Sequence, residues 1–173
     1  MSKIYVGIDN NPSGAVAHLF PDHRQATVVD MPTFSLGGLD CVDEVALWER
    51  YIEPHMPNVF VIFEQGQKNP LFGTKGNYTN GASFRAVHAM LRLMRVRHQL
   101  VNPKTWQKVM FKDVPLGQIP KVGKDSKETK DASVYVARNL FPHINFVPPR
   151  CKNPNDNWSD ALLLAEYARR HNY

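Results

Sequence analysis

The sequence has few cysteines, no long hydrophobic run and no internal repeat, and each absence narrows what the protein can be. Cys41 and Cys151 lack the spacing of metal ligands, so we expect free thiols in a reducing compartment. No apolar run approaches the roughly 18 residues of a membrane span. The N-terminal apolar run ends at Asp9, which argues against a signal peptide. We therefore expect one domain over residues 1–173, with no membrane partner, in the cytoplasm.

Acidic residues are also in the minority, because 21 lysines and arginines face 16 aspartates and glutamates, for a net charge of +5. Such an excess indicates an anionic partner, either nucleic acid or an anionic membrane. Most of the basic residues named below fall in three short stretches. These are Lys121, Lys124, Lys127 and Lys130; Arg85, Arg92, Arg95 and Arg97; and Lys104 and Lys108. For any single one of them, an ordinary solvated surface is an equally good explanation.

The hydrophobic pattern predicts strands and helices in alternation. The expected strands are 3–9, 14–20, 25–31, 59–64 and 98–101. The expected helices are 43–53, 82–97, 103–111, 127–141 and 157–171, and the expected loops are 34–40, 65–80, 112–126 and 145–157. The first three strands have short connections, which favours an antiparallel meander. The whole order is typical of an α/β protein with a mixed sheet.

Four carboxylates stand out by their positions. Asp9 and Glu64 end two apolar strands, and Asp156 and Asp160 open the last helix four residues apart. Ligands of α/β sheets lie beyond the carboxyl ends of strands, and converging carboxylates usually surround a divalent metal. One or two Mg²⁺ ions would relieve the repulsion among the four acids, and a pair of them about 4 Å apart suits phosphodiester hydrolysis. The pattern therefore predicts metal-dependent chemistry on a polyanion.

Asp156 also has a simpler explanation, because an acid before a helix is a favoured N-cap. Asp160 is harder to explain in this way. It adjoins the apolar run that begins at Ala161, although a helix N-terminus does favour an acid.

Three motifs resemble those of the RuvC-type Holliday-junction resolvases, which belong to the RNase H-like superfamily. They are Gly7-Ile8-Asp9, Phe63-Glu64-Gln65 and Asp156-x-x-x-Asp160-Ala161-Leu162, in that order. The segment from Pro103 to Trp106 and the two lysines Lys127 and Lys130 before a helix also resemble that family. The resemblance covers nearly the whole chain. The spacing of four between the last two acids is most similar to the divergent phage and mitochondrial branches, and the compact chain suggests a phage origin.

The resemblance implies an RNase H-like fold, with a five-stranded mixed β-sheet flanked by α-helices. It also implies a homodimer that resolves four-way DNA junctions by paired symmetric nicks, with Mg²⁺ or Mn²⁺ as cofactor, in a bacterial or phage-infected cell. Asp9, Glu64 and Asp160 carry over as catalytic metal ligands. In bacterial members the paired acids are three residues apart, so either Asp156 completes the site or Asn157 substitutes for it.

The basic and aromatic candidates are less closely determined. Bacterial members carry a lysine where Gln107 stands here, with Lys108 adjacent, so which lysine faces the scissile phosphate stays open. Lys130 is our catalytic candidate. The other candidates for DNA contact are Lys104, Lys108, Lys121, Lys124, Lys127, Arg85, Phe72 and Tyr78. The two aromatic residues would either stack on a base or anchor their own loop.

Three other functions compete with junction resolution. A nuclease for flaps or forks would carry the same carboxylates, because substrate choice lies in dimer geometry and loops. A catalytically silent junction-binding protein needs the basic surface but no metal, and the complete set of four acids argues against it. An ATP-using sugar-kinase or actin-like domain is disfavoured, because 173 residues leave no room for a second lobe and no glycine-rich phosphate loop is present.

Overall fold

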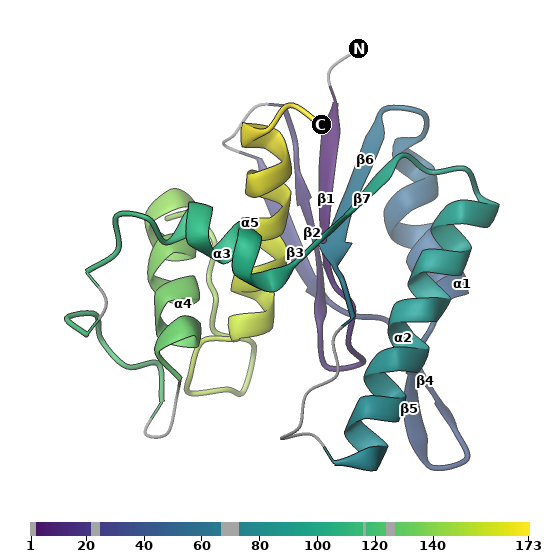
Figure 1. Cartoon of the computed structure of the whole chain (residues 1–173), viewed down its shortest axis with the longest axis horizontal. Coiled ribbons are helices and arrows are strands. Elements are labelled where there is room, and N and C mark those ends of the chain that lie inside the picture. The colour runs from purple at the N-terminus through teal and green to yellow at the C-terminus, as the bar shows by residue number, and fades with distance from the viewer. Residues whose placement is uncertain (1–2, 22–24, 67–72, 116, 124–126) are drawn as a thin grey trace.

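A five-stranded mixed sheet forms the centre of the protein. The computed structural model describes residues 3–21, 25–66, 73–115, 117–123 and 127–173. The strands are β1 (Ile4–Asp9), β2 (Ala15–Leu19), β3 (Ala26–Asp30), β6 (Val59–Glu64) and β7 (His98–Val101). They lie in the order β3-β2-β1-β6-β7 (Figure 1). The first three are antiparallel neighbours, and β6 and β7 continue parallel to β1. The predicted five-stranded mixed sheet is therefore confirmed.

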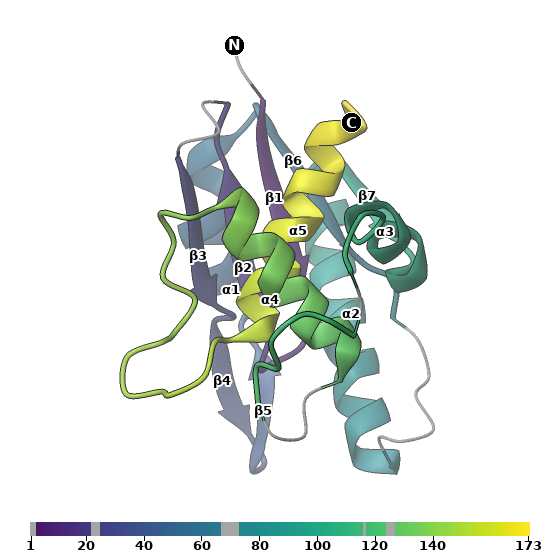
Figure 2. The same cartoon turned by 90° about the vertical axis from the view of Figure 1, so that its left-hand side faces the viewer.

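Helices cover both faces of this sheet (Figures 1 and 2). The helices are α1 (Glu44–Leu47), α2 (Thr74–Leu93), α3 (Pro103–Met110), α4 (Glu128–Leu140) and α5 (Asp156–Arg170). After α1 the chain continues as a π-helical turn over Trp48–Ile52 and a 3-10 turn over Glu53–His55. α5 packs directly on one face with α3 and α4 outside it, while α1 and α2 lie on the other face. In the part of the chain that the structure describes, no helix has the length and apolarity to cross a membrane.

Residues 34–40 are not the loop that the sequence predicted. They belong to a hairpin of β4 (Thr33–Leu36) and β5 (Leu39–Val42), which stands apart from the main sheet beside α2 (Figure 1). Its two-residue turn is Gly37-Gly38, and both glycines have positive φ angles of 57° and 75°. Such a turn matches the twist of two short strands, so the glycine pair that suggested a loop is the centre of a hairpin.

The predicted loop 65–80 is also too long, because α2 begins at Thr74. The first turns of α2 contain residues of low helix propensity, namely Gly76, Asn77 and Asn80. The sequence therefore did not predict a helix there. Farther along, the helix buries Val87, Met90 and Leu91 against the sheet. Packing of this apolar side stabilises the helix despite its weak N-terminal sequence.

The backbones of β1 and α5 are in direct contact at Gly7. A Cβ atom at Gly7 would lie 1.9 Å from the carbonyl oxygen of Ala161 and 2.7 Å from the amide nitrogen of Ala165, which no pair of atoms tolerates. Gly7 thus allows strand and helix backbones to touch, with only alanines on the helix side. The contact fixes the first turns of α5 beside the carboxyl end of β1.

This contact gives the first prediction. Gly7→Ala should destabilise the protein by at least about 3 kcal/mol, because neither backbone can move without disrupting the sheet or α5. Gly81→Ala is the matched control, since its added Cβ meets nothing within 4 Å. In α2 that change should stabilise by up to about 1 kcal/mol. Chemical denaturation of both variants measures the two effects, and an equal stability of Gly7→Ala and wild type would contradict the packing argument.

Candidate active site

Asp9 and Glu64 meet at the carboxyl end of the sheet. The parallel register pairs Ile8 with Phe63, so the two acids follow at the same level on adjacent strands. Side chains alternate along a strand. Tyr5 and Phe60 belong to the core on the α5 side, so Asp9 and Glu64 also face that side. The sequence thus positions both carboxylates by strand length and alternation alone.

Asp9 is almost completely buried, and its pKa is raised from 3.8 to about 7. Burial is the largest cause, and the negative charge of Glu64 is the next. The side-chain amide of Asn11 donates a hydrogen bond of 2.9 Å to one Asp9 oxygen and lowers the pKa, as Lys130 does more weakly. The charge of Lys130 is thus too weak a counter-charge to offset burial and the repulsion from Glu64.

Asp160 reaches the same place from the first turns of α5. Burial raises its pKa well above the usual value, and repulsion from Asp9 is the next cause. The hydroxyl of the buried Ser133, on α4, donates a short hydrogen bond to one Asp160 oxygen. This bond stabilises the charged form and holds the side chain in one orientation.

Glu64 is held by a fully buried aromatic residue. The indole nitrogen of Trp106, on α3, donates a hydrogen bond of 2.7 Å to Glu64 Oε1. Burial raises the pKa of Glu64, and the bond from Trp106 opposes that shift. The indole N–H of Trp106 thus has a hydrogen-bond acceptor inside the core. Because the indole is neutral, it positions the carboxylate of Glu64 without cancelling its charge.

Asp156 forms an ion pair with Lys130 of α4, with 2.5 Å between Oδ2 and Nζ. Asp156 is not the helix cap, because Asn155 accepts the hydrogen bond from the amide of Asn157 and caps α5. The capping explanation of Asp156 is therefore wrong. The side-chain amide of Asn157 donates a hydrogen bond of 2.6 Å to the carbonyl oxygen of Ser13.

The four acids share one electrostatic environment. Asp9, Glu64 and Asp156 each raise the pKa of Asp160, and Glu64 and Asp156 raise that of Asp9. Within the described residues, however, no three side chains of the types Asp, Glu, His or Cys are arranged to hold a metal ion. Each carboxylate instead has a partner in the protein: Asn11, Trp106, Ser133 or Lys130.

The donor set nevertheless fits a hard divalent cation. All the candidate ligands are carboxylate oxygens, the type that Mg²⁺ and Mn²⁺ prefer. The raised pKa values of Asp9 and Asp160 come from burial and from repulsion by neighbouring acids, and a bound cation would relieve this repulsion. The assignment of Asp9, Glu64, Asp156 and Asp160 as metal ligands stays a prediction.

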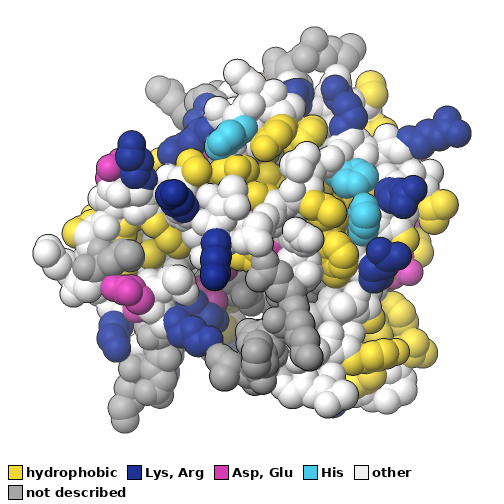
Figure 3. All heavy atoms as spheres, viewed as in Figure 1, with side chains coloured by type: hydrophobic (Ala, Val, Ile, Leu, Met, Phe, Trp, Pro, Cys, Tyr) yellow, Lys and Arg dark blue, Asp and Glu magenta, His cyan; other side chains and the backbone are white. Residues whose placement is uncertain are grey.

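Two of the basic candidates adjoin this centre. Lys127 and Lys130 line a cleft of about 300 Å³ together with Asp156 and Asn153. Lys104 and Lys108 are exposed on α3, Lys121 is exposed before α4, and Arg85 and Tyr78 are exposed on α2. Figure 3 shows Lys and Arg side chains spread across one face of the molecule, including the side of α3 and α4. Phe72 and Lys124 lie outside the described residues.

Three site residues were not found from the sequence. Asn11, Trp106 and Ser133 each bind a carboxylate, yet they belong to three separate segments. Trp106 fell within a segment that resembles the resolvases, which was its only signal. Nothing marked Asn11 and Ser133, because a polar residue in a turn or on a helix is common.

Comparison with solved structures identifies the fold. RuvC of T. thermophilus in complex with a Holliday-junction substrate has a TM-score of 0.58 and 12% sequence identity, covering 98% of this chain and 96% of that chain. Another RuvC structure from Thermus thermophilus has a TM-score of 0.52 and 15% identity, with the same coverage. Neither the protein-family models nor the curated proteins give a match to this chain. The chain has the fold of the RuvC resolvases, and the predicted RNase H-like architecture is confirmed.

The raised pKa of Asp9 predicts a pH-dependent stability in the absence of metal. Between pH 3.8 and about 7 the folded state keeps a proton on Asp9 that the unfolded state has lost. The free energy of unfolding therefore falls as the pH rises through this window. The shift corresponds to about 4 kcal/mol at most. Asp9→Asn should flatten this dependence and raise the melting temperature in EDTA at pH 8.

Thermal melts in EDTA between pH 5 and pH 8 measure this effect. Asp113→Asn is the control, because Asp113 is exposed and should keep the dependence of the wild type. A lower melting temperature of Asp9→Asn at pH 8 would show that this carboxylate stabilises the fold, contrary to the prediction.

Proposed function

We propose that this protein is a metal-dependent, structure-specific endonuclease that resolves four-way DNA junctions by paired symmetric nicks. The observation that carries the proposal is the buried, mutually repelling group of Asp9, Glu64 and Asp160. Burial of uncompensated acids destabilises a protein, so their presence at the carboxyl end of the sheet indicates a function. The RuvC fold supports the choice of junction DNA, since the fold is shared with a RuvC structure bound to a Holliday-junction substrate.

In this proposal Asp9, Glu64 and Asp160 hold Mg²⁺, for which Mn²⁺ substitutes. A bound divalent ion supplies an activated water and stabilises the leaving oxygen of the phosphate. Trp106 and Ser133 keep Glu64 and Asp160 in place, as partners behind metal ligands commonly do. Asp156 would be a further ligand if Lys130, which now pairs with it, were to pair with a DNA phosphate instead.

The basic residues hold the DNA backbone. Lys127 and Lys130 in their cleft lie beside Asp156, so they bind phosphates next to the one that is cut. Lys104, Lys108 and Lys121 extend this surface along α3 and the segment before α4. Contacts of this kind position the substrate without reading its sequence.

We also propose a homodimer, because two opposed cuts in a two-fold junction need two sites related by the same symmetry. The C-terminal end of α2 is the candidate interface, since Leu93 is 79% exposed and Met94 is 43% exposed there. The proposed location is the cytoplasm of a bacterial or phage-infected cell, and the relation to the phage branch stays a prediction.

Two alternatives remain distinct from this proposal. A nuclease for flaps or forks would use the same acids and lysines with another arrangement of DNA arms. A binding protein without catalysis would keep the lysine cleft, but it would have no need for buried acids that repel one another.

Cleavage of matched substrates tests the proposal. With Mg²⁺, the protein should cut a four-way junction by symmetric paired nicks and leave three-way, flap and linear DNA of the same composition largely intact. Asp9→Asn should reduce cleavage at least about 100-fold while junction binding in Ca²⁺ persists, and Asp113→Asn should cleave like wild type. Equal cutting of flaps and junctions would favour the broader nuclease, and junction binding without any cleavage would favour the silent binding protein.

The lysine cleft gives a separate prediction. Lys127→Ala together with Lys130→Ala should weaken junction binding more at 50 mM salt than at 200 mM salt. Each lost phosphate contact lowers the slope of log affinity against log salt by about one. Fluorescence anisotropy across this range measures the slope, and a loss of affinity that is the same at every salt concentration would indicate misfolding instead.

A further inference from the structure

Two hollows outside the proposed catalytic centre adjoin one another between the β4–β5 hairpin and α2. One is the more polar of the two, a cleft of about 480 Å³ that Lys75, Asn80 and the β1–β2 turn at Ser13 help to line. The other is a smaller groove of about 190 Å³, mostly apolar, with Phe34 and Tyr78 in its lining. Leu39, Asp40 and Thr79 line both hollows. The two therefore form one continuous surface with a polar and an apolar half.

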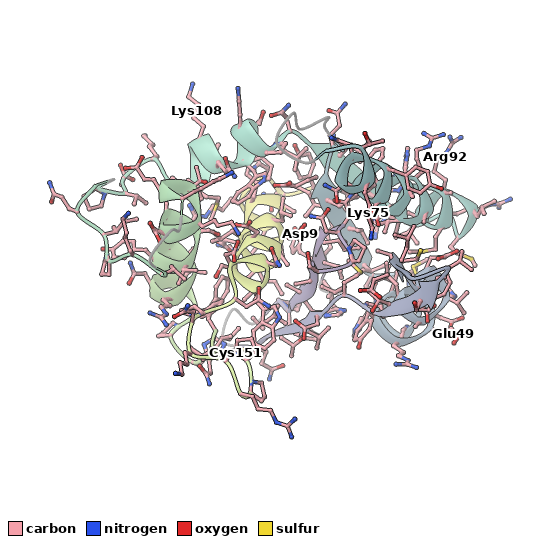
Figure 4. All side chains as sticks on the ribbon, turned by 90° about the horizontal axis from the view of Figure 1, so that it is seen from below. Asp9, Glu49, Lys75, Arg92, Lys108 and Cys151 are labelled. Carbon is pink, nitrogen blue, oxygen red and sulfur yellow. The ribbon has the colours of Figure 1, made fainter. Side chains whose placement is uncertain are left out.

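This surface continues into the catalytic centre. Asn11 lines the polar half and donates its hydrogen bond to Asp9. The cleft of Lys127 and Lys130 reaches the acids from another element, through Asp156. Seen from below, Asp9 lies between α4 and Lys75 of α2 (Figure 4). A DNA strand held at Lys127 and Lys130 would thus cross the acids and continue toward Lys75.

The two halves differ in the part of a nucleotide that they suit. Lys75 is the single cation that the described residues supply to the polar half, where it offers a point charge to a phosphate. Phe34 and Tyr78 are 43% and 67% exposed, although each is large and apolar, and aromatic rings of this kind stack on unpaired bases. Glu44 lines the groove alone, and Asp40 lines both hollows. Both acids can accept hydrogen bonds from an amino group of a base. In the polar half, the charge of Lys75 must outweigh that of Asp40 for a phosphate to bind.

We propose that the β4–β5 hairpin and α2 bind one unpaired nucleotide of the branched DNA, with its phosphate at Lys75 and its base in the groove of Phe34 and Tyr78. The inference rests on the proposed function, because it concerns the part of the DNA substrate that extends from the catalytic centre toward α2, away from α4. A fully paired duplex offers no such base, so the groove would favour branched DNA over linear DNA.

Binding in Ca²⁺ to a four-way junction and to a duplex of the same composition tests the groove. Tyr78→Ala should weaken junction binding about 5- to 100-fold and leave duplex binding nearly unchanged, because one stacked base is lost. Tyr78→Phe should restore the affinity, since it keeps the ring. Tyr135→Ala on α4 is the matched control, as it removes an exposed tyrosine outside the groove.

Lys75→Ala should lower the salt slope of junction binding by about one, and Lys75→Arg should restore it. Arg50→Ala, which removes an exposed cation from the π-helical turn, is the control. The direct test is a junction with 5-iodouracil at the branch point, irradiated in the complex. Mass spectrometry should find the cross-link at Phe34 or Tyr78.

The outcomes separate this inference from the proposed function. A wild type that prefers the junction, with Tyr78→Ala binding equally well and cross-links only outside the groove, would overturn the nucleotide site alone. A wild type that binds junction and duplex equally would overturn both.

Discussion

The contact of two backbones at Gly7 is the constraint on which the rest of the structure depends. A side chain at that position would separate β1 from α5 by the width of a methyl group or more. The acids of the site come from these two elements, with Glu64 added by the neighbouring strand. Because the backbones touch, Asp9 lies near enough to Asp160 to raise the pKa of Asp160 and so to make its ionisation more costly. The close packing at Gly7 thus contributes to the repulsion between the acids of the site.

The partners of the acids explain how so much negative charge is tolerated. Asn11, Trp106 and Ser133 are neutral donors, which fix the positions of carboxylates while leaving their charge in place. Lys130 is the one cation bonded to a site acid within the described residues, and it binds Asp156. The carboxylate oxygens of this centre would fit an added cation, and its raised pKa values are a cost in stability.

The errors of sequence reasoning share a physical cause. The strands beside Gly37-Gly38 and the first turns of α2 have sequences with a weak preference for strand or helix. In the structure the hairpin and α2 pack against each other. Tertiary contacts of this kind are invisible to a pattern of hydrophobic residues along one segment. The long strands and α5 were predicted to within one or two residues, because their apolar runs carry a strong signal of their own.

The sequence by itself determined the five strands, the main helices and the placement of Asp9 and Glu64 at the ends of two strands, since strand alternation and strand length are local properties. It also indicated the RNase H-like fold through the order of its motifs. Only the tertiary structure decided which polar groups bind the acids, that Asn155 rather than Asp156 caps α5, and that the hairpin forms a groove with α2. The partners of the acids and the groove depend on distances between segments far apart in the chain, which are set by packing, while the choice of cap depends on the backbone conformation at the start of α5.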